Sequence, residues 1–318
     1  MKNRFLLYTT LILALSAAFS CKKKDDPTEV KPYLYGVDFD LPTFARPGET
    51  FVLTPYGVYY TEDEPGVEQY LYKWKVNSGD YQTMDTFTLT VEEVGNYVVS
   101  CQANDPDGNY YATSTSKTII VIDPTIGKTL TGTGIALTDD HIFDPRGIEG
   151  ESEYYYKHIG DLDWFRNNLA WTGAGIAYEN ADVTSFPLGR YYTWEEAMTA
   201  CPEGWRLPTD EEWATLGTDA GALMCDAYLN SQKMWTYWPD VNKTNSLEVA
   251  VIPAGFVKPA VTTPTFNRLF DYAAFWTATE SPKDSRMAAF RYLYVQDDEV
   301  KSTYAEKGSL ALSVRCVR

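Results

Sequence analysis

Two helix-start signals, set in a chain otherwise patterned for strands, constrain the fold most. Residues 193–196 (TWEE) and 209–212 (TDEE) both match the capping box, in which a Thr hydroxyl and a Glu carboxylate accept backbone N–H groups. Pro202 and Gly204 stop the first helix, and Gly217 closes the second. The predicted buried faces are Trp194, Ala197, Met198 and Cys201 in the first helix, and Trp213 and Leu216 in the second. Two short helices therefore interrupt a strand-rich domain.

The region 34–124 is patterned as short strands. Residues 70–75 and 86–91 alternate as the two sides of a strand do, and turn residues recur about every ten residues. This spacing is typical of a β-sandwich. A length of 318 residues exceeds what one hydrophobic core usually organises, so a second domain is expected. The predicted fold class is mainly β, with an α+β head after the sandwich.

The later half of this sandwich has a specific pattern. The run GNYVVSCQANDPDGN followed by SKTIIVID resembles polycystic-kidney-disease (PKD) type and related Ig-like repeats. The resemblance implies that Trp74 is the buried core tryptophan, that Tyr97 lies at the corner before the penultimate strand, and that the module is a spacer or adhesive stalk. Asp105, Asp107 and Asn109 are predicted to form a turn, since no acid follows where an EF-hand calcium loop needs one.

The first residues have the features of a secretory signal. Lys2 and Arg4 precede an apolar run at 5–20, and small residues lead into Cys21. This pattern resembles a bacterial lipoprotein signal, which implies that residues 1–20 are removed and that Cys21 is lipidated. The alternative is an ordinary cleaved signal with an incidental cysteine.

Residues 21–33 are predicted to be a flexible tether, since they lack periodicity and cannot bury a core. A lysine followed by two acids after Cys21 resembles the export signal of Bacteroidetes lipoproteins, which implies a surface-exposed place on the outer membrane. Removal of Lys2 and Arg4 changes the formal charge from −17 to −17 − 2 = −19. A chain this acidic is repelled by the phosphate groups of nucleic acids and of anionic lipids. We therefore expect no nucleic-acid partner, and membrane contact only through the lipid anchor.

Five motifs at 147–318 resemble one family. In order they are IGDLDWFRNNLAW, YYTWEEAMTACPEGWRLPTDEEWATL, IPAGF, AFWTATE and LSVRCVR. The set resembles the Fibrobacter succinogenes major paralogous (FISUMP) domain, which is related in pattern to C-type lectin-like domains. The resemblance implies a C-type lectin-like head at 147–318. Residues 125–146 are then a connection, which could add a strand to either neighbour. The family's marker positions fall on Ile159, Gly160, Trp164, Asn168, Leu169, Pro253, Gly255, Trp276, Thr277, Arg315 and Cys316.

Four cysteines follow Cys21, and a secreted chain favours disulfides. Four cysteines allow three pairings. In lectin-like folds the end of the first helix is bonded to the final strand, so the resemblance implies a Cys201–Cys316 disulfide. Cys101 and Cys225 are then predicted to be reduced, with Cys101 partly buried in a strand.

The long segment at 230–272 is the candidate ligand site, because lectin-like folds place their long binding loop there. Exposed rings beside amides and carboxylates would suit sugar recognition. The predicted ligand-binding residues are Trp235, Tyr237, Trp238, Asp240, Asn242, Arg268 and Asp271. The alternative is that these aromatic residues only cover a small core. Other tryptophans coincide with family positions or helix faces and are predicted to be core: Trp164, Trp194, Trp205, Trp213 and Trp276.

Little in the sequence favours catalysis. The two histidines, His141 and His158, are not at metal-ligand spacing, and the paired calcium motifs of sugar-binding C-type lectins are absent from the sequence. No Gly-rich phosphate loop or Ser nucleophile elbow is present. No catalytic residue, metal or cofactor is therefore predicted.

Three functions are open at this point. The first is a cell-surface lipoprotein whose lectin-like head binds an extracellular glycan or a surface protein. The second is an accessory or tip subunit of a fimbria or envelope complex. The third is an enzyme of unknown type.

Overall fold

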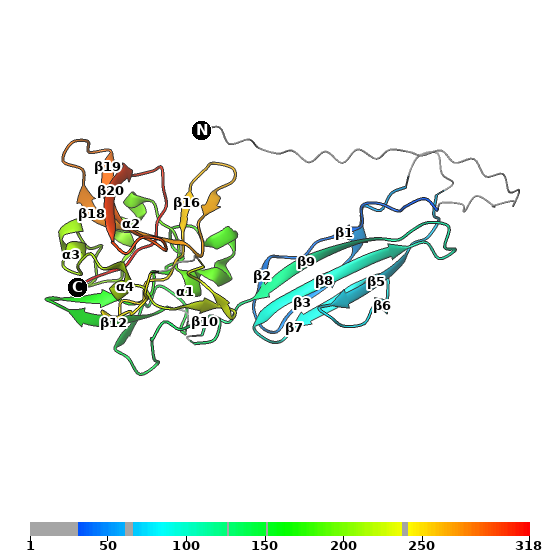
Figure 1. The fold of residues 1–318 in the computed structure, drawn as a ribbon, viewed down its shortest axis with the longest axis horizontal. Coiled ribbons are helices and arrows are strands. Elements are labelled where there is room, and N and C mark those ends of the chain that lie inside the picture. Colours follow the sequence, from blue (N-terminus) through cyan, green and yellow to red (C-terminus); the bar gives the residue numbers. More distant parts are fainter. Residues whose placement is uncertain (1–30, 61–65, 126, 151, 237–240) are drawn as a thin grey trace, which may run out of the picture.

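A computed structural model describes residues 31–60, 66–125, 127–150, 152–236 and 241–318. The described residues are mainly β, with 39% of them in strands and 9% in helices. Figure 1 shows an elongated molecule with a β-sandwich at one end and a head at the other. The mainly β class predicted from the sequence is therefore confirmed. The signal at 1–20 and Cys21 lie outside the described residues.

The N-terminal part is built from two main sheets and a small third one. The larger has the order β2-β9-β8-β5-β6, and the others are β3-β7 and β1-β4. The strands are β1 (Asp38–Phe39), β2 (Phe44–Ala45), β3 (Glu49–Leu53), β4 (Pro55–Tyr56), β5 (Leu71–Val76), β6 (Gln82–Thr83), β7 (Phe87–Val91), β8 (Gly95–Asn104) and β9 (Thr113–Val121). Alternation decides which side is buried, since in β7 Leu89 and Val91 are buried while Thr88 and Thr90 are exposed.

Trp74 is the centre of the sandwich core. It is fully buried, and its ring lies 5.1 Å from that of Phe39 and 5.7 Å from that of Phe87. Cys101 pairs with Trp74 across the β5–β8 ladder, is fully buried and is not bonded to another cysteine. The predicted reduced state is confirmed, but Cys101 is wholly buried because its strand position faces the core.

Two local features of the sandwich follow from single side chains. The Tyr97 hydroxyl donates to the Glu93 carbonyl oxygen at 2.9 Å, which fixes the corner before β8. The Asp105 carboxylate accepts the backbone N–H groups of Asp107, Asn109 and Tyr110, so the predicted turn is confirmed.

The connection at 125–146 adds its strands to the head. β10 (Leu130–Thr131) pairs with β14 (Tyr228–Leu229), and β11 (His141–Phe143) pairs with β12 (Glu153–Ile159). The two possibilities left open by the sequence are thus resolved in favour of the head.

The head has several small sheets around three clusters of buried side chains. The sheets have the orders β10-β14-β15, β11-β12-β13, β16-β17 and β18-β19-β20. Their remaining strands are β13 (Leu162–Phe165), β15 (Gln232–Lys233), β16 (Phe256–Lys258), β17 (Thr265–Asn267), β18 (Tyr272–Glu280), β19 (Met287–Tyr294) and β20 (Lys301–Glu306). The five tryptophans predicted to be core are each at most 8% exposed.

The helices are short. They are η1 (Tyr178–Asn180), η2 (Asp182–Thr184), α1 (Ser185–Leu188), α2 (Trp194–Ala200), α3 (Asp210–Ala214) and α4 (Ala220–Leu223). Both predicted capping boxes are present, at Thr193 and Glu196 and at Thr209 and Glu212. The predicted buried face of α2 is wrong at Met198, which is 43% exposed. The buried residues of α2 are Trp194, Ala197 and Ala200, so Ala200 and not Met198 completes the buried side.

The predicted disulfide joins the end of α2 to the last residues of the chain. The sulfur atoms of Cys201 and Cys316 are bonded, with a Cα–Cα distance of 5.9 Å. Cys225 is buried and not bonded to another cysteine, as predicted. The disulfide holds together two segments that are 115 residues apart in the sequence.

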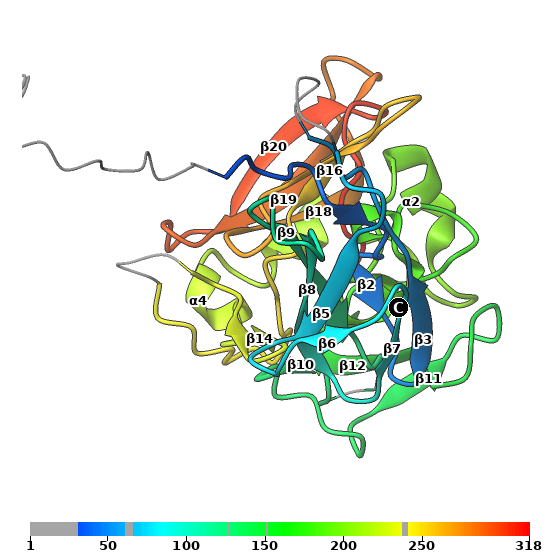
Figure 2. The same cartoon turned by 90° about the vertical axis from the view of Figure 1, so that its right-hand side faces the viewer.

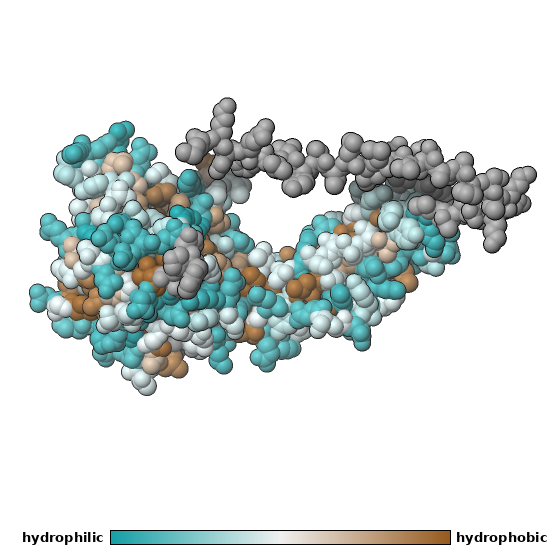
Figure 3. All heavy atoms as spheres, viewed as in Figure 1, coloured by the Kyte–Doolittle hydropathy of each residue, from teal (hydrophilic) through white to brown (hydrophobic). Residues whose placement is uncertain are grey.

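The sandwich meets the head through a few contacts. Asn230 donates to the Val121 carbonyl oxygen at 3.1 Å, and the Phe44 and Tyr178 rings lie 6.2 Å apart. Figure 2, a view along the long axis, shows β5, β6 and β8 in front of the head. The face shown in Figure 3 is mainly hydrophilic, with hydrophobic residues in small groups. No helix among the described residues is long and apolar enough to cross a membrane.

Candidate functional site

The predicted ligand-binding residues fall into three groups in the structure. Trp235 is 1% exposed and packs in the head core, so it presents no exposed ring to a ligand. The sequence prediction failed there because a single aromatic residue does not reveal which side of a loop it faces. Tyr237, Trp238 and Asp240 lie outside the described residues.

Asn242 lies at the surface in an open depression. The depression has a volume of about 240 Å³ and is also lined by Asp226, Lys233, Val241 and Lys243. The Lys233 ammonium lies 3.5 Å from the Asp226 carboxylate. The Asn242 side-chain amide is therefore exposed beside charged groups, where it could make a polar contact with a ligand.

Arg268 and Asp271 are brought together. The Arg268 guanidinium donates two hydrogen bonds to the Asp271 carboxylate, at 3.1 and 3.0 Å, and the two side chains are 40% and 34% exposed. The same guanidinium lies 4.4 Å from the Tyr294 ring centre and 5.4 Å from that of Tyr272. Tyr272 in turn stacks on Tyr292, with ring centres 5.4 Å apart. These five residues, Arg268, Asp271, Tyr272, Tyr292 and Tyr294, form what we call the Arg268 patch.

The strand register places the three tyrosines on one side of the sheet. Tyr272 in β18 pairs with Tyr294 in β19, and Tyr292 follows two residues away on the same face. All three rings are partly exposed. The sequence analysis missed them, although the alternation in the string RYLYV (291–295) is a signal that could have found them.

The loop that holds Arg268 has an unusual backbone. Arg268 and Phe270 have φ angles of 62° and 80°, which non-glycine residues rarely adopt. Residues held in such conformations cluster at functional sites, because the surrounding structure must enforce them. Here Pro253 and Gly255, both in the family motif IPAGF, hold the loop in this conformation. Phe270 donates its backbone N–H to the Pro253 carbonyl oxygen at 3.0 Å, and Gly255 donates to the Tyr272 carbonyl oxygen at 2.7 Å.

Two groups of the patch have raised pKa values. The hydrogen bonds to Asp271 are the main reason that the pKa of Arg268 is raised above its ordinary value. Burial raises the pKa of Tyr272, so its hydroxyl stays protonated and able to donate. The patch thus offers a guanidinium, a carboxylate and neutral ring faces within one small area.

One family model matches the C-terminal half of the chain. It is the Fibrobacter succinogenes major domain, and it covers residues 158–318, slightly more than half of the 318 residues. The chain belongs to this family. The Fibrobacter succinogenes major domain thus contains the capped helices, the disulfide and the whole Arg268 patch. No curated protein matches the chain.

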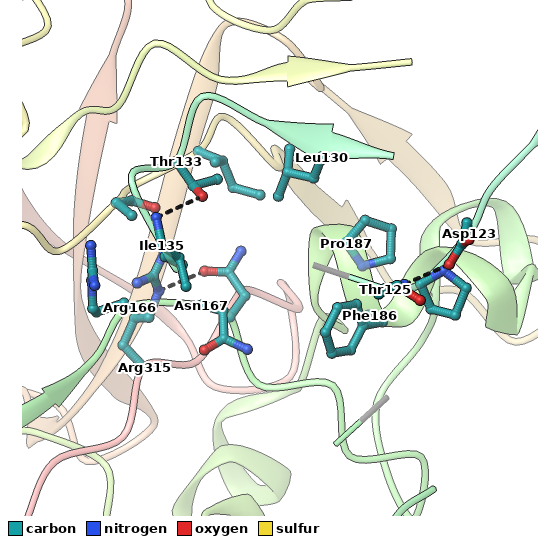
Figure 4. A pocket seen from close by; sticks show the side chains of 14 residues that line it. Asp123, Thr125, Leu130, Thr133, Ile135, Arg166, Asn167, Phe186, Pro187 and Arg315 are labelled. Carbon is teal, nitrogen blue, oxygen red and sulfur yellow. Dashed lines mark hydrogen bonds between the residues drawn. The ribbon is translucent and has the colours of Figure 1, made fainter. Parts of the chain in front are cut away.

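A second pocket lies between the connection and the core of the Fibrobacter succinogenes major domain. Figure 4 shows Arg166, Asn167 and Arg315 across from Phe186 and Pro187. The space open to water is about 30 Å³, enough for one or two water molecules but not for a sugar. This pocket is therefore too small to be the ligand site.

The arginines of this pocket hold the domain together. Arg166 forms an ion pair with Asp139 and donates to the carbonyl oxygens of Gly134 and Glu248, at 2.8 and 2.7 Å. These bonds tie the connection to the domain. Their role is structural, since each guanidinium is directed at groups of the protein itself.

The described residues also contain no gathering of three or more His, Cys, Asp or Glu side chains that could hold a metal ion. His158 contacts Asp163 at 2.9 Å, and His141 contacts the Asp139 carbonyl oxygen at 2.9 Å. Each histidine therefore contacts a group of the protein itself.

Proposed function

We propose that this chain is a cell-surface lipoprotein that displays a lectin-like binding head on a PKD- or Ig-like β-sandwich stalk. The proposed location at the cell surface rests on the sequence around Cys21. The stalk is supported by the buried Trp74 and by the Tyr97 hydroxyl bonded to the backbone upstream, a contact typical of Ig-like corners. The head is supported by two capped helices and a disulfide to the final segment.

The observation that most supports binding is the Arg268 patch. A guanidinium lies over two tyrosine rings while paired with a carboxylate, in a loop whose strained backbone is held by Pro253 and Gly255. Sugar C–H groups pack on ring faces, and sugar hydroxyls donate to a carboxylate and accept from a guanidinium. The patch therefore fits a neutral or acidic glycan from the cell's surroundings.

A surface protein is the second ligand class for the same patch. Tyr and Arg are the residues that most often supply binding energy at protein interfaces. A fimbrial or envelope role would make this ligand another subunit of an assembly. The two classes call for different tests, because a glycan binds as an isolated oligosaccharide and a subunit does not.

A glycan array tests the proposal directly. The chain from residue 22 to 318 should bind a subset of glycans, and Arg268→Ala should weaken binding about tenfold or more, since loss of one charged contact costs at least ~1.4 kcal/mol. Arg286→Ala is the matched control, because Arg286 forms a similar exposed pair with Asp284, at 2.8 Å, between β18 and β19. That control should bind as the parent does.

Three other outcomes are informative. Silence on the whole array would refute a glycan ligand and leave the protein ligand. Binding that survives in a folded Arg268→Ala variant but is lost in Trp238→Ala would place the site elsewhere in the long loop. Protection of the protein from protease on intact cells would contradict the surface address.

A further inference from the structure

A cluster of exposed tyrosines lies on the sandwich, far from the Arg268 patch. Five rings are between 36% and 59% exposed, which is unusual for so many large side chains in one small module. We call this cluster the tyrosine end; its members are Tyr33, Tyr35, Tyr59, Tyr60 and Tyr111. Nothing in the core of the sandwich requires these rings, since its core cluster is built from other side chains.

Four of the rings share one face. Tyr33 pairs with Tyr111 and Tyr35 pairs with Tyr59 through backbone bridges, while Leu34 between them is 2% exposed and points to the core. The ring centres of the two pairs are 4.8 and 5.6 Å apart. Each ring thus packs against its partner and remains about half exposed to solvent. The four rings form one ordered amphipathic surface and not a set of independent side chains.

The tyrosine end lies at the opposite end of the sandwich from the head. Tyr111 comes just before β9, whose last residue, Val121, accepts the hydrogen bond from Asn230 of the head. Nine residues of strand span roughly 30 Å. Figure 1 shows the loop that begins β9 at the end of the sandwich remote from the head.

The chain that carries the lipidation signal enters at this same end. The first described residue is Lys31, two positions before Tyr33. Cys21 is ten residues earlier, and ten residues extend to at most roughly 35 Å. A lipid on Cys21 therefore keeps the tyrosine end close to the membrane surface.

We propose that the tyrosine end rests among the headgroups of the lipid bilayer. This inference rests on the proposed lipid anchor and extends membrane contact beyond it. Tyrosine has an apolar ring and a polar tip, and it is enriched at membrane interfaces for that reason. The contact of a few half-exposed rings is weak alone, but a short tether makes it effective by raising the local concentration.

Charges of both signs lie beside the rings. The turn that contains Asp105 and Asp107 follows β8 at this end of the sandwich, and the Lys31 ammonium lies beside Gly108 in the same turn. A zwitterionic headgroup also carries both signs, so it suits this end of the sandwich. With its tyrosine end on the bilayer, the sandwich holds the head and the Arg268 patch away from the membrane.

Nitration of tyrosine, mapped residue by residue by mass spectrometry, tests the inference. The chain from Cys21 to Arg318 is given a hexahistidine segment ahead of Cys21 and bound to zwitterionic vesicles that contain nickel-chelating lipid. Attachment then does not depend on lipidation of Cys21. Nitration of Tyr33, Tyr35, Tyr59 and Tyr111 should fall by roughly threefold or more, since rings among headgroups lose contact with the aqueous reagent.

The same molecule contains its own controls. Tyr81 and Tyr304 are 42% and 45% exposed and lie outside the tyrosine end, so their nitration should not change. By neutron reflectometry on a supported bilayer, the parent should show one upright orientation. The variant that combines Tyr33→Ser, Tyr35→Ser, Tyr59→Ser and Tyr111→Ser, checked for folding by circular dichroism, should lose it. Retention of that orientation would overturn the inference.

Other outcomes separate this inference from the proposed function. Nitration of Tyr33, Tyr35, Tyr59 and Tyr111 that is the same with and without vesicles would refute membrane contact and leave the anchored binding head intact. Protection without vesicles would also refute it, because a second copy or another partner would then cover the rings. Protection by added oligosaccharide alone would assign the surface to glycan. Failure of Cys21 to take up labelled fatty acid in cells would refute the proposed lipid anchor. It would leave the nitration result on vesicles unchanged, because attachment there uses the hexahistidine segment.

Discussion

At the residue scale, Arg315 shows how one family-motif side chain organises the head. Its guanidinium is fully buried and donates to the Asn168 side-chain oxygen and to the carbonyl oxygens of Phe165, Val249 and Ala250, at 2.6–3.0 Å. These four hydrogen bonds join the final segment, which carries Arg315, to the segments at 165–168 and 249–250. Removing it would leave buried acceptors without partners, which explains why this position is occupied by arginine and not by an apolar residue.

Buried tyrosines at the same scale predict instability in alkali. Burial raises the pKa of Tyr154, Tyr191 and Tyr192 above the ordinary value of 10.0, and that of Tyr178 to about 12. The unfolded chain loses these protons first, so the stability they contribute is present below pH 10 and is lost as the pH rises through the folded values. Arg315 acts in the opposite direction, since burial lowers its pKa to about 9, but it is one group against four.

We therefore expect cooperative unfolding of the head as the pH rises above about 10, followed by far-ultraviolet circular dichroism. Tyr191→Phe should reduce the slope of the free energy of unfolding against pH in this range. Tyr304→Phe, at an exposed position, is the control and should leave the slope unchanged. A slope that is equal in all three proteins would contradict the assignment.

At the element scale, the segment at 252–256 shapes the loop that carries the Arg268 patch. Gly255 has a φ of +74°, and a Cβ atom at this position would lie 2.2 Å from the Asn267 carbonyl oxygen. Such an approach is possible only for glycine. The motif IPAGF is thus required by close packing of two backbones, and it fixes the entry to β18.

The substitution Gly255→Ala should disturb this element and the site together. We expect the free energy of unfolding to fall by about 2–4 kcal/mol, because the new methyl group meets backbone and the positive φ is strained. Glycan binding should weaken as Arg268 shifts. Gly308→Ala is the matched control, since a Cβ there meets nothing within 4 Å. Urea unfolding of both variants checks the prediction, and equal stability would refute it.

At the scale of the whole molecule, the sandwich and the head have separate cores. The sandwich core lies within residues 37–121, and the three head clusters contain only residues from 130 onward. The contacts between them are few and partly polar. The disulfide lies wholly in the head, and Cys101 of the sandwich is unbonded. The two parts should therefore unfold separately.

Scanning calorimetry should show two transitions, only one of which depends on the disulfide. The double variant Cys201→Ala and Cys316→Ala removes a loop constraint of 115 residues, worth about 4–5 kcal/mol in the chain-entropy model. The head transition should fall by about 10 °C or more, and the sandwich transition should not move. Cys225→Ala, which removes a buried unbonded thiol, is the control for lost packing. A single transition, or a shift of both, would contradict separate unfolding.

The sequence by itself determined the features that depend on neighbours along the chain. The capping boxes, the alternating strands and the Asp105 turn depend on residues a few positions apart, and the family pattern added the Cys201–Cys316 pairing. Burial at the ends of elements was less predictable, as the exposed Met198 and the buried Trp235 show.

The tertiary structure alone decided which distant segments meet. It placed Arg268 over the rings of Tyr272 and Tyr294, assigned the connection to the head, and set Tyr33 against Tyr111. The physical reason is that local patterns specify which face of an element is buried but not which partner buries it. That choice depends on the packing of the whole core and on close backbone approaches such as the one at Gly255.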